Sequence, residues 1–469
     1  MFRHIPRPDP VLVLALLFAL GFRLGWALYM DARPFDDAQS YFNLASDIAN
    51  GRTYDEFGKA YWPVGYPATL ALFFLAFGES VGSAEALNII VSLLIVTLTY
   101  NLAHQLQGRH VARLAALLVA FLPGQIFTVT LVLSESVFSA VQLAALCLLV
   151  AALKREPPKL EEEESTTPLA TSTSLAGLAP AAAIPLTTAL GSALLVVVLL
   201  LASWRWRSAQ LALFTLAGVF AGYALLVKPV AIVLVPALLL ALLLIRGRVP
   251  MRACAMLLYA AVFVVVTLAT VAPWSARNIE ELGTPALTTN AGVNTLIGYH
   301  DGAGGCWSFD YENHRYVTEI EDEMERQREA FDLAFDFIRD EPLETAALIP
   351  LRFECIWDND EDALGHWNRF QQDKQLSEPG YSVVRFVNNW YYYALLALAV
   401  LGLPLWWRWR TVQVLLPLVV IFTVLYYMAF YGDDRYHQPL MPLIAIWAAC
   451  GVSLIPRWSR MRPISWPRS

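Results

Sequence analysis

The chain has 469 residues, of which 57% are hydrophobic and only 16% are charged, and its formal net charge is −7. Soluble domains are about half apolar and about a quarter charged, so this composition excludes an ordinary soluble enzyme and predicts an integral membrane protein. The sequence has neither a Lys/Arg-rich block nor a zinc-type Cys/His spacing, which argues against nucleic acid as a partner.

Apolar runs long enough to cross a bilayer recur along the chain. The first, residues 11–29, lacks a small-residue cleavage site after it, and we interpret it as a retained helix. Arg3 and Arg7 precede it, so the positive-inside rule places the N-terminus in the cytoplasm and the first loop, residues 31–62, outside. Further spans are expected at residues 84–105, 111–127, 131–153, 209–227, 229–245, 253–274, 389–407, 411–430 and 438–456.

Two more apolar segments leave the number of spans open. Residues 184–203 are apolar enough to cross, yet both flanks are basic, so a re-entrant hairpin, an interfacial helix or a missed partner span would each explain them. Residues 64–77 are short for a span and suit an interfacial helix better. We therefore expect an all-α membrane protein with about 10 to 13 transmembrane helices.

The first outer loop contains two adjacent carboxylates. Asp36 and Asp37 precede apolar residues at helical spacing, which predict an amphipathic helix on the membrane surface that ends at Asn50 and Gly51. Capping of that helix explains one carboxylate but not both. Asp36 is therefore also a candidate general base, because partial desolvation at the membrane boundary raises the pKa of a carboxylate.

Two long segments are polar. Residues 156–180, rich in Pro, Glu, Ser and Thr, predict a disordered cytoplasmic linker. Residues 275–385 predict an acidic exoplasmic domain with helical periodicity around residues 319–340. The ordinary explanation of these acidic residues is that they keep the domain soluble. The alternative is that they line an acidic groove that binds a cationic substrate. The chain thus divides into an N-terminal membrane module (1–274), the exoplasmic domain (275–385) and C-terminal transmembrane helices (386–469).

Five cysteines occur in the chain. Cys147, Cys254 and Cys450 fall inside apolar runs, where a thiol behaves as a small hydrophobic group. Cys306 and Cys355 are the two in the outer domain, and an oxidising exoplasm would permit a disulfide between them.

Charged residues also stand at the predicted outer ends of helices. Glu135, Lys228, Arg277 and Arg435 all occupy such positions. Snorkelling from helix ends is the ordinary explanation for a single one. Lys228, Arg277 and Arg435 on one side of the bilayer could instead clamp a phosphate, which predicts a phosphate-bearing lipid whose head group lies outside.

Several segments resemble motifs of the GT-C superfamily of membrane glycosyltransferases, on the branch of protein O-mannosyltransferases and aminoarabinose transferases. The matching segments are residues 36–41 (DDAQSY), 61–67 (YWPVGYP), 133–135 (LSE), 227–229 (VKP), 272–278 (APWSARN), 288–299 (TTNAGVNTLIGY) and 434–439 (DRYHQP). They follow the order of the family and span nearly the whole chain.

This resemblance implies a GT-C fold and a sugar donor linked to a polyprenyl phosphate, with inversion at the anomeric carbon. Asp36 would be the base, and Lys228, Arg435 and Arg277 would bind the donor phosphate. The residues implied in acceptor binding or in an auxiliary role are Asp37, Glu135, Tyr66, Asn290 and His437.

Departures from the family pattern leave the cofactor and acceptor open. Asp37 replaces the usual Glu, and Tyr299 stands where Asn is common. A divalent cation is a candidate cofactor, with Asp36 and Glu135 as candidate ligands. The acceptor is a lipid, a glycan or a protein, and the expected location is the inner (plasma) membrane with an exoplasmic active site.

Two other classes compete with a glycosyltransferase of this branch. A lipid-linked-sugar flippase or carrier would have ionisable groups near mid-span and matched repeats, which the sequence does not show clearly. A ligase or polymerase that uses an undecaprenyl-pyrophosphate donor would carry its base in a large loop between later helices. Asp36 in the first loop argues against it.

Overall fold

The computed structural model describes residues 8–31, 33–155, 189–205, 208–247, 253–370, 376–406 and 411–458. These residues form helices and connecting loops without a named strand, and one isolated backbone bridge joins Cys306 to Gly432. The predicted all-α class is therefore confirmed. The linker predicted at residues 156–180 lies outside the described residues.

The helices follow the expected order along the chain. The N-terminal part comprises α1 (Pro10–Tyr29), α2 (Asp37–Ala49), α3 (Gly65–Phe77), α4 (Val81–Gln107), α5 (Arg109–Ala120), α6 (Pro123–Phe127), η1 (Thr128–Thr130), α7 (Glu135–Lys154), α9 (Ala189–Arg205), α10 (Ala209–Val227), η3 (Pro229–Val233), α11 (Leu234–Ile245) and α12 (Ala253–Leu282). The remainder comprises α13 (Ala291–Gly298), α14 (Tyr311–Glu319), α15 (Glu323–Asp340), α16 (Pro342–Trp357), α17 (Asp362–Phe370), α18 (Glu378–Gly402), η4 (Leu403–Trp406), η5 (Val412–Val414), α19 (Leu415–Met428), η6 (Asp434–Leu440) and α20 (Met441–Trp458).

Fewer helices qualify as full spans than the 10 to 13 expected. Six described helices are long and apolar enough to cross a membrane, and the pair α5 and α6, bent by 56°, makes a seventh candidate. The expected spans at 229–245 and 411–430 form shorter apolar helices, Pro229–Ile245 and Val412–Met428, each of which begins with a 3₁₀ turn. The two ambiguous segments also form short apolar helices, α3 and α9. Helices α12 and α18 run across positions 274 and 385, where the domain boundaries were drawn.

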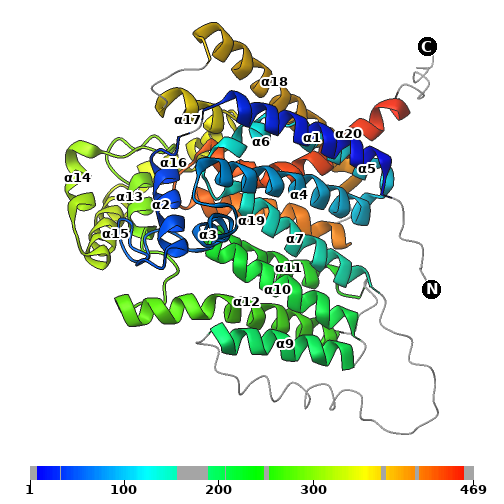
Figure 1. Ribbon diagram of the computed structural model, residues 1–469, viewed down its shortest axis with the longest axis horizontal. Helices are drawn as coiled ribbons and strands as arrows, with labels where there is room; N and C mark the ends of the chain where they lie inside the picture. Colours follow the sequence, from blue (N-terminus) through cyan, green and yellow to red (C-terminus); the bar gives the residue numbers. More distant parts are fainter. Residues whose placement is uncertain are drawn as a thin grey trace, which may run out of the picture.

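Helix α7 and the segment from η6 through α20 form the centre of the bundle. In the most apolar stretch of each, 78% of the residues are buried inside the protein. The corresponding share for α1, at the periphery, is 17%. Helix α7 packs between α4 and α10, and α20 packs against α5 and α18. In Figure 1 the long helices run side by side, and η6 contacts α7.

A buried arginine binds the end of α5, where the third expected span is bent. Arg23 in α1 is fully buried, and its guanidinium donates to the carbonyls of Val119 (3.3 Å) and Ala120 (3.0 Å) at the end of α5. The last carbonyls of a helix have no partner within the helix. Arg23 satisfies two of them and places a positive charge at the negative end of the α5 dipole.

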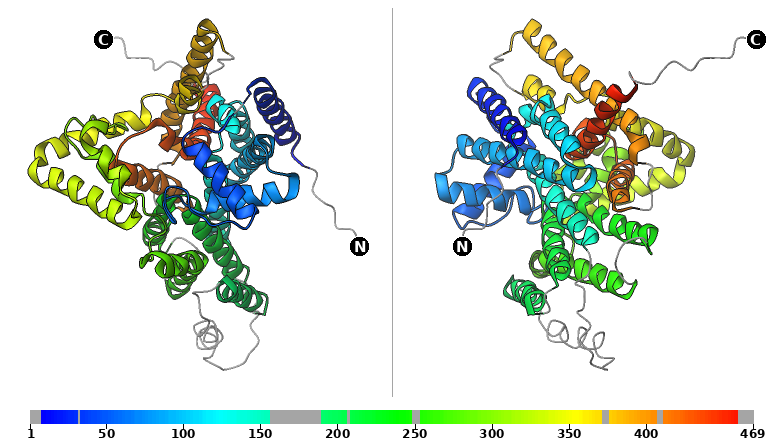
Figure 2. Two further views of the ribbon diagram at one scale, coloured as in Figure 1. Left: turned by 60° about the vertical axis from the view of Figure 1, so that its left-hand side comes forward. Right: turned by 90° about the vertical axis from the view of Figure 1, so that its right-hand side faces the viewer.

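Helices α13 to α16 form a lobe at one end of the bundle. Figure 1 places α2, α13, α14 and α15 at its left-hand side, and Figure 2 shows the yellow-green helices projecting away from the apolar core. The predicted helix around residues 319–340 is confirmed as α15. The predicted disulfide is also present, because Cys306 is bonded to Cys355 of α16.

Candidate active site

Lys228 and Glu135 form a buried ion pair between neighbouring helices. Glu135 is the first residue of α7, and Lys228 directly follows α10, which packs against α7. The Lys228 Nζ lies 2.6 Å from Glu135 Oε1, and the two side chains are only 15% and 9% exposed. We call this end of the bundle the site end.

Gly65 allows α3 to pack against the backbone that leads to Lys228. A Cβ atom at Gly65 would lie 2.7 Å from Leu226 C and Val227 N. The Tyr223 hydroxyl donates to the Gly65 carbonyl at 2.9 Å and lies 2.6 Å from Thr69 Oγ1. The glycine of the YWPVGYP segment thus permits a backbone contact that no other residue could make.

A second ion pair joins the first outer loop to the C-terminal part. Arg435 of η6 donates from Nη1 to Asp37 Oδ2 at 3.1 Å. Asp433 supports the same residue, because its Oδ1 accepts from the Arg435 backbone N–H at 3.0 Å and its Oδ2 lies 3.6 Å from Nε. The Arg435 Nε is buried and makes no hydrogen bond within the described part of the chain.

The two ion pairs belong to one site. The positive charge of Arg435 interacts electrostatically with Glu135 and with Asp36. Glu135 Oε2 is buried and has no hydrogen-bond partner among the described residues. Two cations, four carboxylates and unsatisfied polar atoms therefore meet at the site end.

Asp36 has an unusual backbone conformation. Its φ of 51° and ψ of −126° are rare for a residue other than glycine, and its side chain makes no capping hydrogen bond to α2. Such strain persists only where the surrounding structure fixes it, and it concentrates at functional sites. Partial burial and the adjacent Asp37 raise the pKa of the Asp36 carboxyl, while Arg435 lowers it. Capping thus does not account for Asp36, and its environment suits a proton acceptor.

Aromatic rings line this region. The Tyr41 ring lies 5.1 Å from the Trp62 ring and 5.3 Å from the Tyr66 ring. Tyr66 is fully buried, and its hydroxyl has no hydrogen-bond partner within the described residues. Tyr436 stacks on Tyr427 with ring centroids 3.8 Å apart.

Three predicted site residues have other surroundings. Arg277 donates to the Lys59 carbonyl at 2.6 Å and lies over the Trp274 ring, so it contacts the first loop. Asn290 is the residue before α13 and makes no side-chain cap. His437 is fully buried, with Nε2 3.2 Å from Asp360 Oδ1. This setting fits a structural role for His437.

The acidic lobe of helices α13 to α16 holds the first loop through residues that the sequence does not single out. Glu323 of α15 is buried, and its carboxylate accepts from the backbone of Lys59 (2.8 Å) and Ala60 (3.2 Å). Arg326, one turn further on, donates to the Phe57 carbonyl and lies over the Phe57 ring. Spacing along the chain contains no signal for such long-range contacts.

Two groups of side chains among the described residues could hold a metal ion. One is His300, Asp310 and His314, and the other comprises Asp362, Asp433 and Asp434. Neither includes the predicted ligands Asp36 and Glu135, and Glu135 already binds Lys228.

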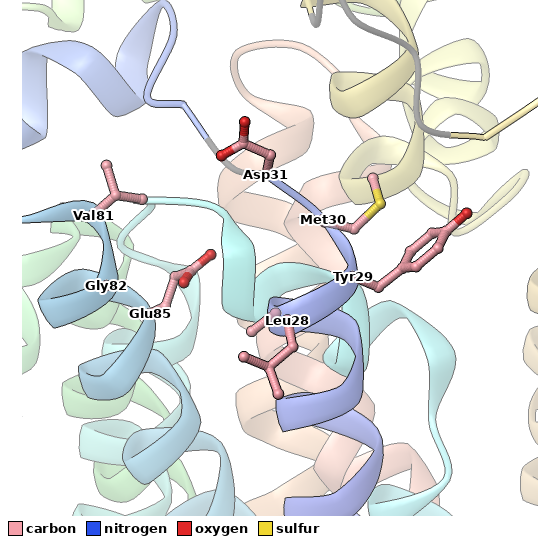
Figure 3. Close-up of a pocket in the computed structure, with 8 residues that line it drawn as sticks. Leu28, Tyr29, Met30, Asp31, Val81, Gly82 and Glu85 are labelled. Atoms are coloured by element: carbon pink, nitrogen blue, oxygen red, sulfur yellow. The ribbon is translucent and has the colours of Figure 1, made fainter.

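A pocket of about 370 Å³ opens beside the end of α1 and the start of α4. Figure 3 shows Asp31 and Glu85 on its wall together with Leu28 and Tyr29. None of the predicted site residues lines it. The pocket is therefore distinct from the charged pairs.

Comparisons with known proteins agree with this architecture. Residues 74–210 match the family model described as dolichyl-phosphate-mannose-protein mannosyltransferase. No curated protein sequence is significantly similar to the chain.

Solved structures show the same fold. The oligosaccharyltransferase of Archaeoglobus fulgidus in its apo form aligns with a TM-score of 0.53 and 15% identity over 96% of this chain and 50% of the other. The same enzyme, AglB, in complex with an inhibitory peptide and a dolichol-phosphate aligns with a TM-score of 0.51 and 16% identity, over 97% of this chain and 52% of the other. The chain thus spans about half the length of these relatives.

Proposed function

We propose that this chain, which has the GT-C fold of membrane glycosyltransferases, transfers a sugar from a polyprenyl-phosphate donor to an acceptor hydroxyl at the site end. The observation that carries the proposal is the meeting of Lys228 and Arg435 beside the strained carboxylate Asp36. The family model names a dolichyl-phosphate-mannose donor, and AglB was solved with a dolichol-phosphate. Both support a lipid phosphate as the carrier.

In this proposal Asp36 is the general base. It removes the proton from the acceptor hydroxyl while that oxygen attacks the anomeric carbon of the sugar. The bond between the sugar and the phosphate oxygen breaks on the opposite face, so the configuration inverts. General-base catalysis contributes about 10²–10⁴-fold to a rate, and a raised pKa makes the Asp36 carboxylate a stronger proton acceptor.

Lys228 and Arg435 stabilise the leaving phosphate. Negative charge grows on that phosphate as the bond breaks, and fixed cations in a site shielded from water stabilise it without reorganisation. The unbonded Arg435 Nε offers a further donor to a phosphate oxygen. Glu135 and Asp37 hold the two cations in place when no donor is bound. Of the two predicted metal ligands, Glu135 is paired with Lys228, and the charge of Arg435 lowers the pKa of Asp36.

We place the site end on the exoplasmic side of the inner membrane. At the opposite end of the bundle, Asp9 before α1 accepts from Arg109 (2.6 Å) and Arg113 (2.9 Å), and α7 ends in Lys154. The positive-inside rule assigns this basic end to the cytoplasm. The disulfide between Cys306 and Cys355 lies in the lobe at the other end and requires an oxidising compartment.

The remaining predicted residues complete the proposal. Tyr66 lines the site near Glu135, and Arg277 supports the first loop at Lys59. The acceptor is a lipid, glycan or protein hydroxyl, and Asn290 and His437 stay candidates for its binding region.

The experiment is transfer from a panel of radiolabelled polyprenyl-phosphate sugars in membranes that contain the wild type or Asp36→Asn at matched expression. The control is Asp55→Asn, an exposed aspartate of the same loop. Loss of transfer in Asp36→Asn alone supports the proposal. Equal transfer by both variants removes Asp36 from the reaction, and no incorporation by the wild type from any donor overturns the glycosyltransferase assignment.

A further inference from the structure

His300, Asp310 and His314 come together in the outer lobe, away from the proposed active site. One ligand atom from each residue lies within 4.8 Å of the others. His300 follows α13, Asp310 directly precedes α14, and His314 lies within α14. The two imidazole rings have centroids 5.9 Å apart.

The hydrogen bonds of His300 leave one ring nitrogen able to bind a metal. Nδ1 lies 2.8 Å from the Asp301 carbonyl, which can only accept, so Nδ1 carries the proton and donates it. Nε2 lies 3.2 Å from the Ser308 hydroxyl and 3.3 Å from the Ser308 carbonyl, so the closer Asp301 carbonyl takes the ring proton and Nε2 keeps the lone pair that a metal would bind. A carbonyl on the far nitrogen is the arrangement that orients metal-binding histidines in proteins.

His314 has an unsatisfied nitrogen in the same place. Its Nδ1 is buried and has no hydrogen-bond partner within the described residues. Buried polar atoms in folded proteins almost always have a partner, so an orphaned ring nitrogen beside a second histidine and a carboxylate indicates a missing ligand.

We propose that His300, Asp310 and His314 bind a zinc ion, with a fourth position open to water. Two imidazoles and one carboxylate suit Zn²⁺, whereas magnesium and calcium prefer sites made of oxygen alone. None of the three residues belongs to the proposed donor site, so this inference stands independently of the transferase function.

The zinc ion would fix the loop between α13 and α14. That loop carries Cys306, which is bonded to Cys355, and the adjacent Trp307 N–H donates to the Gly432 carbonyl at 3.0 Å. Gly432 N–H in turn donates to Gly305 at 2.7 Å. Gly432 is three residues before Arg435, so metal binding would stiffen the segment that positions this cation.

The test measures zinc bound to the full chain, purified in detergent with a tag that contains no histidine. Protein stripped with a chelator receives Zn²⁺, is desalted and is analysed by mass spectrometry for metal content. We expect about one zinc per wild-type chain and at least a tenfold weaker affinity in His314→Ala and Asp310→Asn. His104→Ala, which removes an exposed histidine of α4, is the control.

A second measurement guards against misfolded variants. Cobalt added to the stripped wild type should give visible absorption bands of a tetrahedral site, and excess zinc should remove them. Wild-type protein that holds no zinc and shows no cobalt bands overturns the proposal. Zinc retained at wild-type affinity by His314→Ala and Asp310→Asn, or lost equally by His104→Ala, also overturns it.

Discussion

Arg435 donates to Asp37 at 3.1 Å although the two residues are 398 positions apart in the sequence. The pair connects the start of the first outer helix to the turn before the last helix. It therefore closes the proposed site across the whole chain. Asp37 lies on one side of the guanidinium, and Asp433 lies 3.6 Å from its Nε, which makes no hydrogen bond within the described residues.

Arg435→Lys should weaken donor use although it keeps the charge. Lysine cannot contact Asp37 and a phosphate at once with a planar fork of donors. Loss of one hydrogen bond to a charged group costs about 1.5–3 kcal/mol, which predicts a decrease in kcat/KM of about 10- to 150-fold. Steady-state transfer kinetics over a range of donor concentrations measure it. Unchanged kinetics would show that Arg435 does not contact the phosphate.

Variants of the pair between Lys228 and Glu135 should distinguish its contribution to stability from its contribution to transfer. Lys228→Met leaves the carboxylate of Glu135 buried without a partner, and such changes cost about 3–5 kcal/mol. The double variant Lys228→Met/Glu135→Leu should regain most of the thermal stability but no transfer activity. Thermal unfolding in detergent and the transfer assay give the two readouts. Activity in the double variant would remove Lys228 from phosphate binding.

Gly65→Ala should reduce transfer without changing a charged residue. The added Cβ would lie 2.7 Å from the backbone at residues 226 and 227, so α3 or the segment before Lys228 must move. Displacements of this kind cost about 10²-fold in catalysis when they misplace a reacting group. Gly82→Ala in α4, where a Cβ meets no atom closer than 3.8 Å, is the matched control and should keep wild-type transfer.

The pH dependence of transfer should report Asp36. A general base works when deprotonated, so kcat/KM should fall as the pH decreases through a pKa that lies above the usual aspartate value. Asp37→Asn removes one cause of that raised pKa, which predicts an acid limb shifted to lower pH. Profiles of the wild type, Asp37→Asn and Asp55→Asn would be compared. If the acid limb of the profile has the same midpoint in Asp37→Asn as in the wild type, the titrating group is not Asp36.

Removal of the disulfide should destabilise the outer lobe. The two cysteines are separated by 49 residues, and loss of a native disulfide typically costs about 2–5 kcal/mol. Cys306→Ser and Cys355→Ser should therefore lower the unfolding temperature, and a reductant should lower it in the wild type but not in the variants. Cys254→Ser changes an exposed free cysteine and should leave the unfolding temperature unchanged. Equal stability of all three variants would argue against the disulfide.

Local patterns in the sequence predict the helices well. Apolar length predicted each helical span, and the spacing of Tyr41, Leu44 and Ala45 predicted α2, whose buried face contains all three. The number of full spans was less predictable, because proline and 3₁₀ turns shorten the helices within apolar runs of adequate length.

Contacts between distant segments could not be read from the sequence. Because Lys228 and Arg435 stand at the predicted outer ends of helices, the sequence predicts that they lie on the same side of the membrane. It does not predict that they form ion pairs with Glu135 and Asp37. Glu323 resembles any solvated acid in sequence, and its role follows only from the fold that brings the first loop against it. The same holds for His300 and His314, which lie outside any zinc-type spacing and meet only in the folded chain, where α13 and α14 both pack against α15.

The central position of α20 also bears on how the protein is made. Arg435 lies in η6, the segment that leads into this helix, and both are synthesised long after Asp37. Until they emerge, Asp37 lacks its counter-ion and α7 lacks a neighbour at the middle of the bundle. The contact between the first loop and η6 thus forms only after α20 has been made, and the two ends of this ion pair meet late in folding.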